Sequence, residues 1–176
     1  MKCFSAVVLV GLLNLLPQVS YAAGWKETLK EYNCLEVEKF GVNREGSATK
    51  EEKRSAAISE ETLGRLQEKI VAEIAKENLF ASVVKAGQGT CSGNKLSFGG
   101  KVTDYKKGNA AKRILIIGFG TGKQKYQVDS YVKNKKTGEM LAQKIITDRY
   151  YGAVAAQKRG EKDFAEKVAK FVAKGE

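Results

Sequence analysis

The C-terminal half of the chain carries the pattern of a β-hairpin. Residues 123–133 alternate in character along the chain, and residues 134–138 contain the Asn and Gly that hairpin turns favour. Residues 139–151 are the second predicted strand of the pair. One face of the first strand consists of Tyr126, Val128, Ser130 and Val132. Because side chains alternate across a strand, we expect this face to point into the core.

Two amphipathic helices are expected to cover the sheet. The first begins after Ser59, a helix-capping residue, and Glu60 and Glu61 place negative charge at its N-terminus, where the helix dipole favours it. Its apolar stripe is Leu63, Leu66, Ile70 and Ile74. The stripe of the second helix, which closes the chain, is Phe164, Val168, Phe171 and Val172. Steps of three and four residues predict that each helix buries one side.

Shorter segments complete the predicted fold. We expect a helical turn at residues 25–32 and strands at 32–40, 79–84, 95–105 and 111–119. The first two of these strands, with the helix between them, predict a parallel crossover. The predicted class is therefore α+β: a mixed, mostly antiparallel sheet of about five or six strands, with two amphipathic helices on one face.

The first 22 residues have the three parts of a secretory signal peptide. Lys2 gives a positive start, residues 4–19 are an apolar run, and Ser20-Tyr21-Ala22 is a small-residue cleavage site. Cleavage near Ala22 predicts a periplasmic or secreted protein with no transmembrane segment after processing. A retained amphipathic anchor or a buried first helix is the alternative.

The mature chain, residues 23–176, is expected to form a single domain with an exposed, mobile loop near residues 41–57, where apolar periodicity is absent. Its two cysteines, Cys34 and Cys91, are a candidate disulfide in an oxidising compartment. Two buried free thiols are the alternative. Because the chain has no histidine and these cysteines stand alone, we expect neither a metal site nor a cofactor.

Residues 108–152, GNAAKRILIIGFGTGKQKYQVDSYVKNKKTGEMLAQKIITDRYYG, combine a strand, a GFGTG turn and a hairpin with TGE at its tip. This segment resembles the exported bacterial family known as domain of unknown function 4410. The resemblance implies an extracytoplasmic α+β protein without an established activity. It also implies that many relatives are lipoproteins, whereas this chain has no cysteine placed for lipid attachment, because Cys3 has no apolar region before it.

The glycines of that turn, Gly118, Gly120 and Gly122, also invite comparison with nucleotide-binding loops. Their spacing lacks the last glycine of the dinucleotide fingerprint and the GKS/T end of a P-loop, and a strand follows where either motif needs a helix. We therefore interpret them as a candidate turn or bulge, in which glycine reaches positive φ without strain.

Charge is distributed unevenly along the mature chain. Residues 23–80 carry 10 basic and 12 acidic side chains, whereas residues 81–176 carry 20 and 8, which gives about −2 and +12. The candidate anion- or partner-binding residues are Lys106, Lys107, Lys112, Arg113, Lys123, Lys125, Lys135 and Lys136. They fall at predicted strand ends and turns, so we expect them to converge on one rim of the sheet. A lysine-rich surface that only keeps the protein soluble is the alternative.

Catalysis has little support in the sequence, because histidine is absent and no serine or cysteine lies in a nucleophile motif. No catalytic residue is therefore assigned. The expected function is a non-enzymatic exported binding or envelope-associated module for an envelope protein or an anionic envelope component. Nucleic acid matches the charge but not the compartment, and the oligomeric state stays open.

Two other functions remain as alternatives. One is a carboxylate-based hydrolase, which would need two of the acids Asp104, Asp129, Asp148 and Asp163 to converge in a pocket. The other is a structural subunit of an envelope assembly, which would expose an apolar patch or an unpaired sheet edge.

Overall fold

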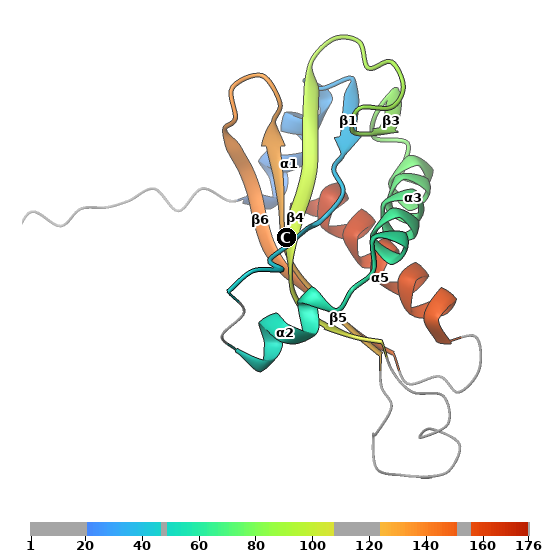
Figure 1. Ribbon diagram of the computed structural model, residues 1–176. Coiled ribbons are helices and arrows are strands. Elements are labelled where there is room, and N and C mark those ends of the chain that lie inside the picture. The colour runs from blue at the N-terminus through green and yellow to red at the C-terminus, as the bar shows by residue number, and fades with distance from the viewer. Residues whose placement is uncertain (1–20, 47–48, 108–123, 151–155, 176) are drawn as a thin grey trace, which may run out of the picture.

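The computed structural model describes residues 21–46, 49–107, 124–150 and 156–175 (Figure 1). In chain order the elements are α1 (Tyr21–Lys30), β1 (Cys34–Val37), β2 (Gly41–Val42), α2 (Lys50–Ala56), α3 (Glu60–Lys76), β3 (Ser82–Lys85), β4 (Lys95–Lys106), β5 (Gln124–Asn134), β6 (Met140–Tyr150) and α5 (Ala156–Lys174). Three predicted features lie outside the described residues. They are the strand at 111–119, the glycine turn, and the apolar run that precedes the signal peptide cleavage site.

The strands form one six-stranded mixed sheet in the order β3-β1-β4-β5-β6, with β2 also paired to β4. β1 runs parallel to β3 and to β4, so that β1, α3 and β3 form the predicted parallel crossover. The long strands β4, β5 and β6 pair antiparallel. The predicted α+β class, with a mostly antiparallel sheet, is confirmed.

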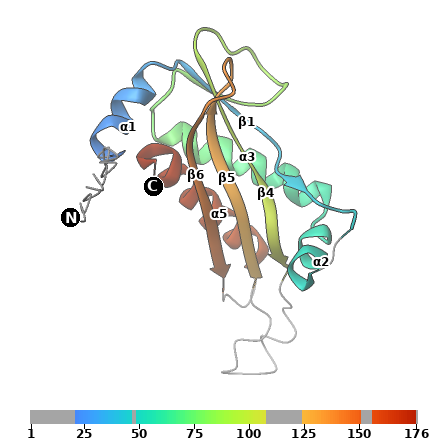
Figure 2. The ribbon, with the colours of Figure 1, turned by 90° about the vertical axis from the view of Figure 1, so that its left-hand side faces the viewer.

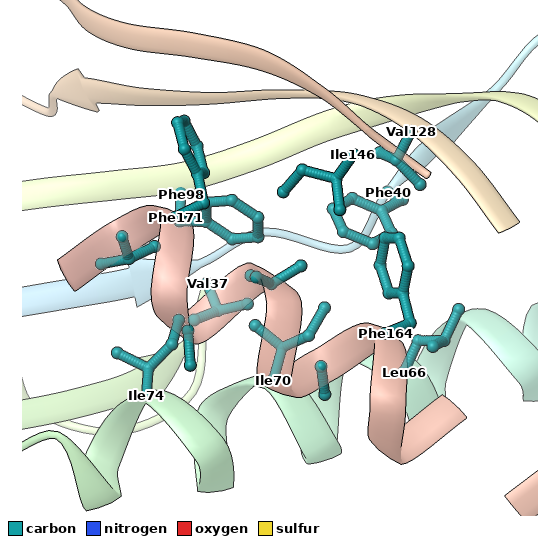
Figure 3. Packing of buried hydrophobic residues seen from close by; sticks show 14 of the residues in the cluster. Val37, Phe40, Leu66, Ile70, Ile74, Phe98, Val128, Ile146, Phe164 and Phe171 are labelled. Atoms are coloured by element: carbon teal, nitrogen blue, oxygen red, sulfur yellow. The ribbon is translucent and has the colours of Figure 1, made fainter. Parts of the chain in front are cut away.

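Helices α3 and α5 cover one face of the sheet, and Figure 2 looks onto the other face. The core between the layers is apolar, and ring pairs such as Phe40–Phe98 and Phe40–Phe164 meet edge to face at 5.9 and 6.1 Å (Figure 3). Every residue of the two predicted helix stripes is buried. The alternation predicted for β5 is confirmed too, because Tyr126 and every second residue after it to Val132 are buried.

The prediction of an exposed loop near 41–57 was wrong in part. Thr49 and Glu52 form a capping box, in which each side chain accepts a hydrogen bond from the other residue's backbone N–H, and α2 follows. This helix has only seven residues, and Ser55 is its one buried residue. It therefore has no apolar stripe from which its presence could be inferred. Ser59, by contrast, caps α3 as predicted.

Cys34 and Cys91 form the disulfide that the sequence left open. The bond joins the first residue of β1 to the connection between β3 and β4. Trp25 of α1 donates a hydrogen bond from Nε1 to the backbone oxygen of Val172 at 2.9 Å, which ties α1 to the end of α5. In the described part of the chain, no helix has both the length and the apolar character needed to cross a membrane.

Candidate functional site: a basic cleft at one end of the sheet

Three cations stand side by side across the ends of the long strands. Lys106 of β4 is the register partner of Lys125 of β5, and Lys125 is in turn the partner of Arg149 of β6. Register partners share a face. Because the neighbouring Tyr126 is buried in the core, the three cations lie on the face turned away from α3 and α5. Figure 2 looks onto this face of the sheet. Like charges directly opposite each other destabilise a sheet. The row therefore needs negative charge nearby.

Asp104 supplies part of that charge. Its buried carboxylate accepts hydrogen bonds from Arg54 Nε and Nη2 at 2.8 and 2.9 Å and from Lys125 Nζ at 2.7 Å. Burial alone would raise the pKa of Asp104, but these hydrogen bonds outweigh it, and the pKa is lowered from its ordinary value. The same contact raises the pKa of Arg54. The ionised Asp104 thus orients Arg54 and Lys125 at the sheet surface.

These groups line one open cleft of about 400 Å³ between α2 and the ends of the long strands. The basic cleft, as we call it, is lined by Lys50, Arg54, Asp104, Lys106, Lys125 and Arg149. Arg54 has a second acidic partner in the exposed Glu51, at 2.8 Å. Lys50, Lys106 and Arg149 have no ion-pair partner among the described residues. Positive charge is therefore in excess, an arrangement that suits a phosphate, sulfate or carboxylate group.

Replacing Asp104 with asparagine should lower the free energy of unfolding at pH 7 by about 2 kcal/mol, because Arg54 and Lys125 lose a buried charged partner. The lowered pKa of Asp104 also sets the pH dependence. The stability that the ionised Asp104 contributes is fully present above the ordinary aspartate pKa of 3.8 and is lost as the pH falls through the lower pKa of the folded protein. Urea unfolding at pH 7 and pH 3 measures both effects. Asp129→Asn, whose partner is the uncharged Gln143, is the control and should change little.

The predicted anion-binding residues do not all come together. Lys106 and Lys125 meet in the basic cleft, and the exposed Lys107 directly follows β4. Lys135 and Lys136 lie after the opposite end of β5, roughly 33 Å away for ten strand residues. There Lys135 pairs with Glu36 at 3.2 Å. The prediction of one rim was therefore wrong for this pair. Residues that lie outside the described part are Lys112, Arg113, Lys123, Gly118, Gly120 and Gly122.

Sequence reasoning missed half of the cleft. Lys50 and Arg54 were overlooked because α2 was not predicted. Arg149 could not be placed by counting outward from the turn, because the Lys133–Met140 pair extended along the strands puts Asp148 opposite Lys125, and a register shift between Val132 and Lys133 brings Arg149 there instead.

The four candidate aspartates do not form a catalytic pair. Asp104 binds its two cations, Asp129 accepts a hydrogen bond from Gln143 at 3.0 Å, and Asp148 pairs with Lys167 at 2.5 Å. Asp163 lies on α5, with no contact to the other three among the described interactions. Across residues 21–175 with their gaps, no cluster of three or more metal-ligating side chains occurs either.

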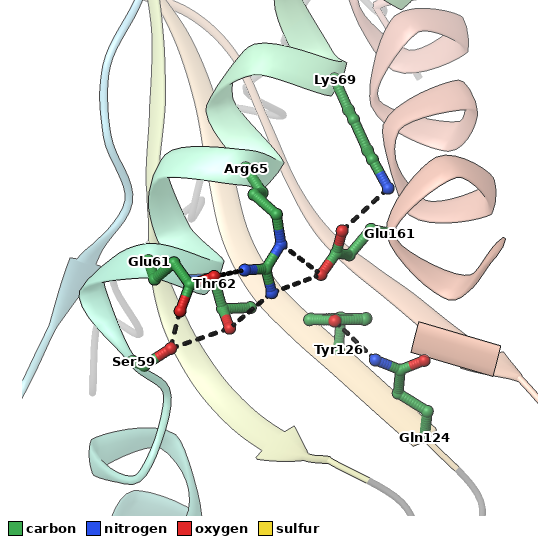
Figure 4. A network of polar contacts seen from close by, with 8 residues as sticks. All are labelled: Ser59, Glu61, Thr62, Arg65, Lys69, Gln124, Tyr126 and Glu161. Carbon is green, nitrogen blue, oxygen red and sulfur yellow. Dashed lines mark hydrogen bonds and ion pairs between the residues drawn. The ribbon is translucent and has the colours of Figure 1, made fainter. Parts of the chain in front are cut away.

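A second polar cluster has a structural role. Glu161 of α5 is fully buried and pairs with Arg65 at 3.1 Å and Lys69 at 2.8 Å, both from α3 (Figure 4). Tyr126 lies beside this cluster and accepts a hydrogen bond from Gln124 at 2.6 Å. Burial raises the pKa of Tyr126, so its hydroxyl stays protonated. The cluster holds α3 to α5.

A family model described as "Domain of unknown function (DUF4410)" matches residues 29–155. Among solved structures, the fold is similar to the PelC dodecamer from Paraburkholderia phytofirmans, with a TM-score of 0.53 and 9% identity over 82% of this chain and 89% of that one. Protein XCC0632 from Xanthomonas campestris gives a TM-score of 0.45 at 12% identity, over 81% and 82% of the two chains. No curated protein matches the chain.

Proposed function

We propose that this chain, which belongs to the DUF4410 family of domains of unknown function, is a non-enzymatic, extracytoplasmic binding module that holds an anionic envelope component in its basic cleft. One observation carries the proposal: Lys106, Lys125 and Arg149 stand in direct cross-strand register. Such a row is unfavourable in the free protein. A bound anion relieves the repulsion between these cations, and this relief adds to the affinity for the anion.

Two features support an extracytoplasmic location. The N-terminal sequence has the three parts of a secretory signal peptide. The disulfide between Cys34 and Cys91 suits an oxidising compartment, because cytosolic proteins rarely keep such bonds. A non-enzymatic role is supported by the lack of histidine and by the separate partners of Asp104, Asp129 and Asp148.

The cleft suits a ligand that carries phosphate, sulfate or carboxylate groups on a larger body. Arg149 can donate a pair of parallel hydrogen bonds, whereas Lys50 and Lys106 supply point charges from two sides. Asp104 keeps Arg54 and Lys125 in place without cancelling the excess charge. Since the cleft is open to solvent, binding should weaken as salt rises.

Reversing two charges tests the cleft. We expect Lys106→Glu/Arg149→Glu to weaken the binding of inorganic pyrophosphate at low salt by about tenfold or more, which corresponds to about 1.4 kcal/mol. Isothermal titration calorimetry of the mature protein measures this. The matched control is Lys26→Glu/Lys136→Glu, which makes the same charge change at exposed positions outside the cleft. Equal weakening by both variants would mean that general surface charge, and not the cleft, attracts the anion.

The source of the anionic group is separated by two further probes. Vesicles with phosphatidylglycerol present phosphate on a lipid surface, whereas soluble polyphosphate presents it on a free chain. A cleft that serves a membrane should favour the vesicles, and one that serves a polymer should favour the free chain. In either case the Lys106→Glu/Arg149→Glu variant should lose the preference.

A second candidate function is a subunit of a homo-oligomeric envelope assembly. It is supported by the fold shared with PelC, whose crystal structure is described as a dodecamer. The mass of the mature protein by mass photometry tests this candidate. A discrete species with the mass of many subunits, such as a dodecamer, would favour it, and a monomer at all concentrations would remove it.

A further inference from the structure

Strand β6 leaves one long edge of the sheet unpaired in the described part of the chain. It has 11 residues, and its only partner there is β5 (Figure 2). The register runs without a shift from the Gln124–Tyr150 pair to the Val132–Ala142 pair. Every second residue of β6 therefore turns its N–H and C=O groups away from the sheet, which is the template that an added strand uses.

The side chains of β6 are unusual for a free edge. Among the described residues, only two large hydrophobic side chains are exposed, Met140 at 50% and Ile145 at 60%, and both belong to β6. Ile145 is the register partner of Asp129, so it lies on the same sheet face as the basic cleft. Ile145 thus stands exposed in the middle of a regular edge strand, where an added strand would cover it.

A groove of about 400 Å³ runs beside this edge, between β6 and α5. The residues that line it are Lys144, Ile145, Ile146, Thr147, Lys167, Lys170 and Phe171. Its floor is apolar, through Ile146 and Phe171, and its rim is basic. Lys167 pairs with Asp148, whereas Lys144 and Lys170 have no ion-pair partner in the part of the chain that the structure describes.

We propose that β6 accepts an extended, acidic segment of another protein, which adds a strand to the sheet. On that strand, acidic side chains would face the groove and pair with Lys144 and Lys170. The alternate side chains would be apolar and would lie beside Ile145. The segment therefore alternates acidic and apolar residues, a pattern set by the period of two along a strand.

Charge argues against a second copy of this chain as the occupant. Two β6 edges brought together would also bring together two basic groove rims. The opposite edge of the sheet, β3, has only four residues and contains Lys85 and no acid. Neither edge of the chain offers the acidic strand that the groove requires.

This site goes beyond the proposed function and can fail independently of it. Lys144 lies five residues from Arg149, roughly 16 Å along the strand, and its side chain points to the opposite face. Variants in the groove should therefore leave pyrophosphate binding unchanged.

The test uses a fluorescent ten-residue peptide that alternates glutamate and valine, with lysine for glutamate in the comparison peptide. Fluorescence anisotropy should show that the mature protein binds the acidic peptide at least ten times more tightly. Lys144→Glu/Lys170→Glu should weaken this binding about tenfold. Ile145→Glu should weaken it too, because the apolar side chains of the peptide lose their contact with Ile145. This variant should still fold, since Ile145 is exposed and its replacement spares the core. Lys26→Glu/Lys136→Glu is again the matched control and should bind normally.

Hydrogen exchange locates the peptide. Backbone amides of β6 should exchange more slowly with the acidic peptide bound, while those of β3 stay unchanged. Three results would overturn the proposal: no binding of the acidic peptide, equal binding of the basic peptide, or unchanged exchange in β6. A β6-dependent dimer that excludes the peptide would also overturn it and would identify a second copy as the occupant.

Discussion

Removal of the Cys34–Cys91 disulfide is expected to lower the free energy of unfolding by about 4 kcal/mol. The bond closes a loop whose ends are 57 residues apart, and on the loop-entropy model a closure of this length restricts the unfolded chain by about that amount. A domain of this size has a net stability of about 5–15 kcal/mol, so the loss is a large part of it.

The measurement compares urea unfolding of the wild type, with and without a thiol reductant, and of the Cys34→Ala/Cys91→Ala variant. The reduced wild type should approach the variant, and the variant itself should not respond to the reductant. Alanine is chosen because Cys34 is buried, where a serine hydroxyl would need a new partner. A wild type whose unfolding ignores the reductant would contradict the prediction.

The second large effect is expected at Glu161, where replacement by alanine should lower the free energy of unfolding by about 3 kcal/mol. The fully buried carboxylate joins α5 to Arg65 and Lys69 of α3. Breaking a buried ion pair costs about 3–5 kcal/mol. Because the Arg65 and Lys69 side chains are 32% and 29% exposed, both can regain water, which places the loss at the lower end.

Urea unfolding at pH 7, followed by circular dichroism, measures the change. The control is Glu166→Ala on the same helix, which removes an exposed pair with Lys162 and should cost less than about 1 kcal/mol. If both variants lost the same small amount, Glu161 would not be the contact that holds the two helices together.

The sequence predicted the elements whose signal is local. Ser59 and the stripe from Leu63 to Ile74 define α3, and alternation through Tyr126 defines β5, because burial on one face repeats with the period of the element. Helix α2 was missed because its capping box replaces an apolar stripe as its main stabilising feature. Short helices that rest on caps leave little periodicity to detect.

The basic cleft was only half predictable, because its contacts join distant parts of the chain. Arg54 meets Asp104 across 50 residues, a pairing that neither spacing nor propensity encodes. The placement of Lys135, in contrast, followed from strand direction alone: it comes after the end of β5 opposite to Lys125. Treating the lysines as one rim overlooked this geometry.

The central claim is that the basic cleft, and not the basic surface in general, binds the anion. The most direct measurement is a two-dimensional ¹⁵N NMR titration of the mature protein with pyrophosphate at low salt. We expect saturable shifts concentrated at Lys50, Arg54, Lys106, Lys125 and Arg149, with the amides near Lys136 unchanged. Weak, unsaturable shifts spread over all exposed lysines would contradict the claim and would identify the positive charge as a solvated surface.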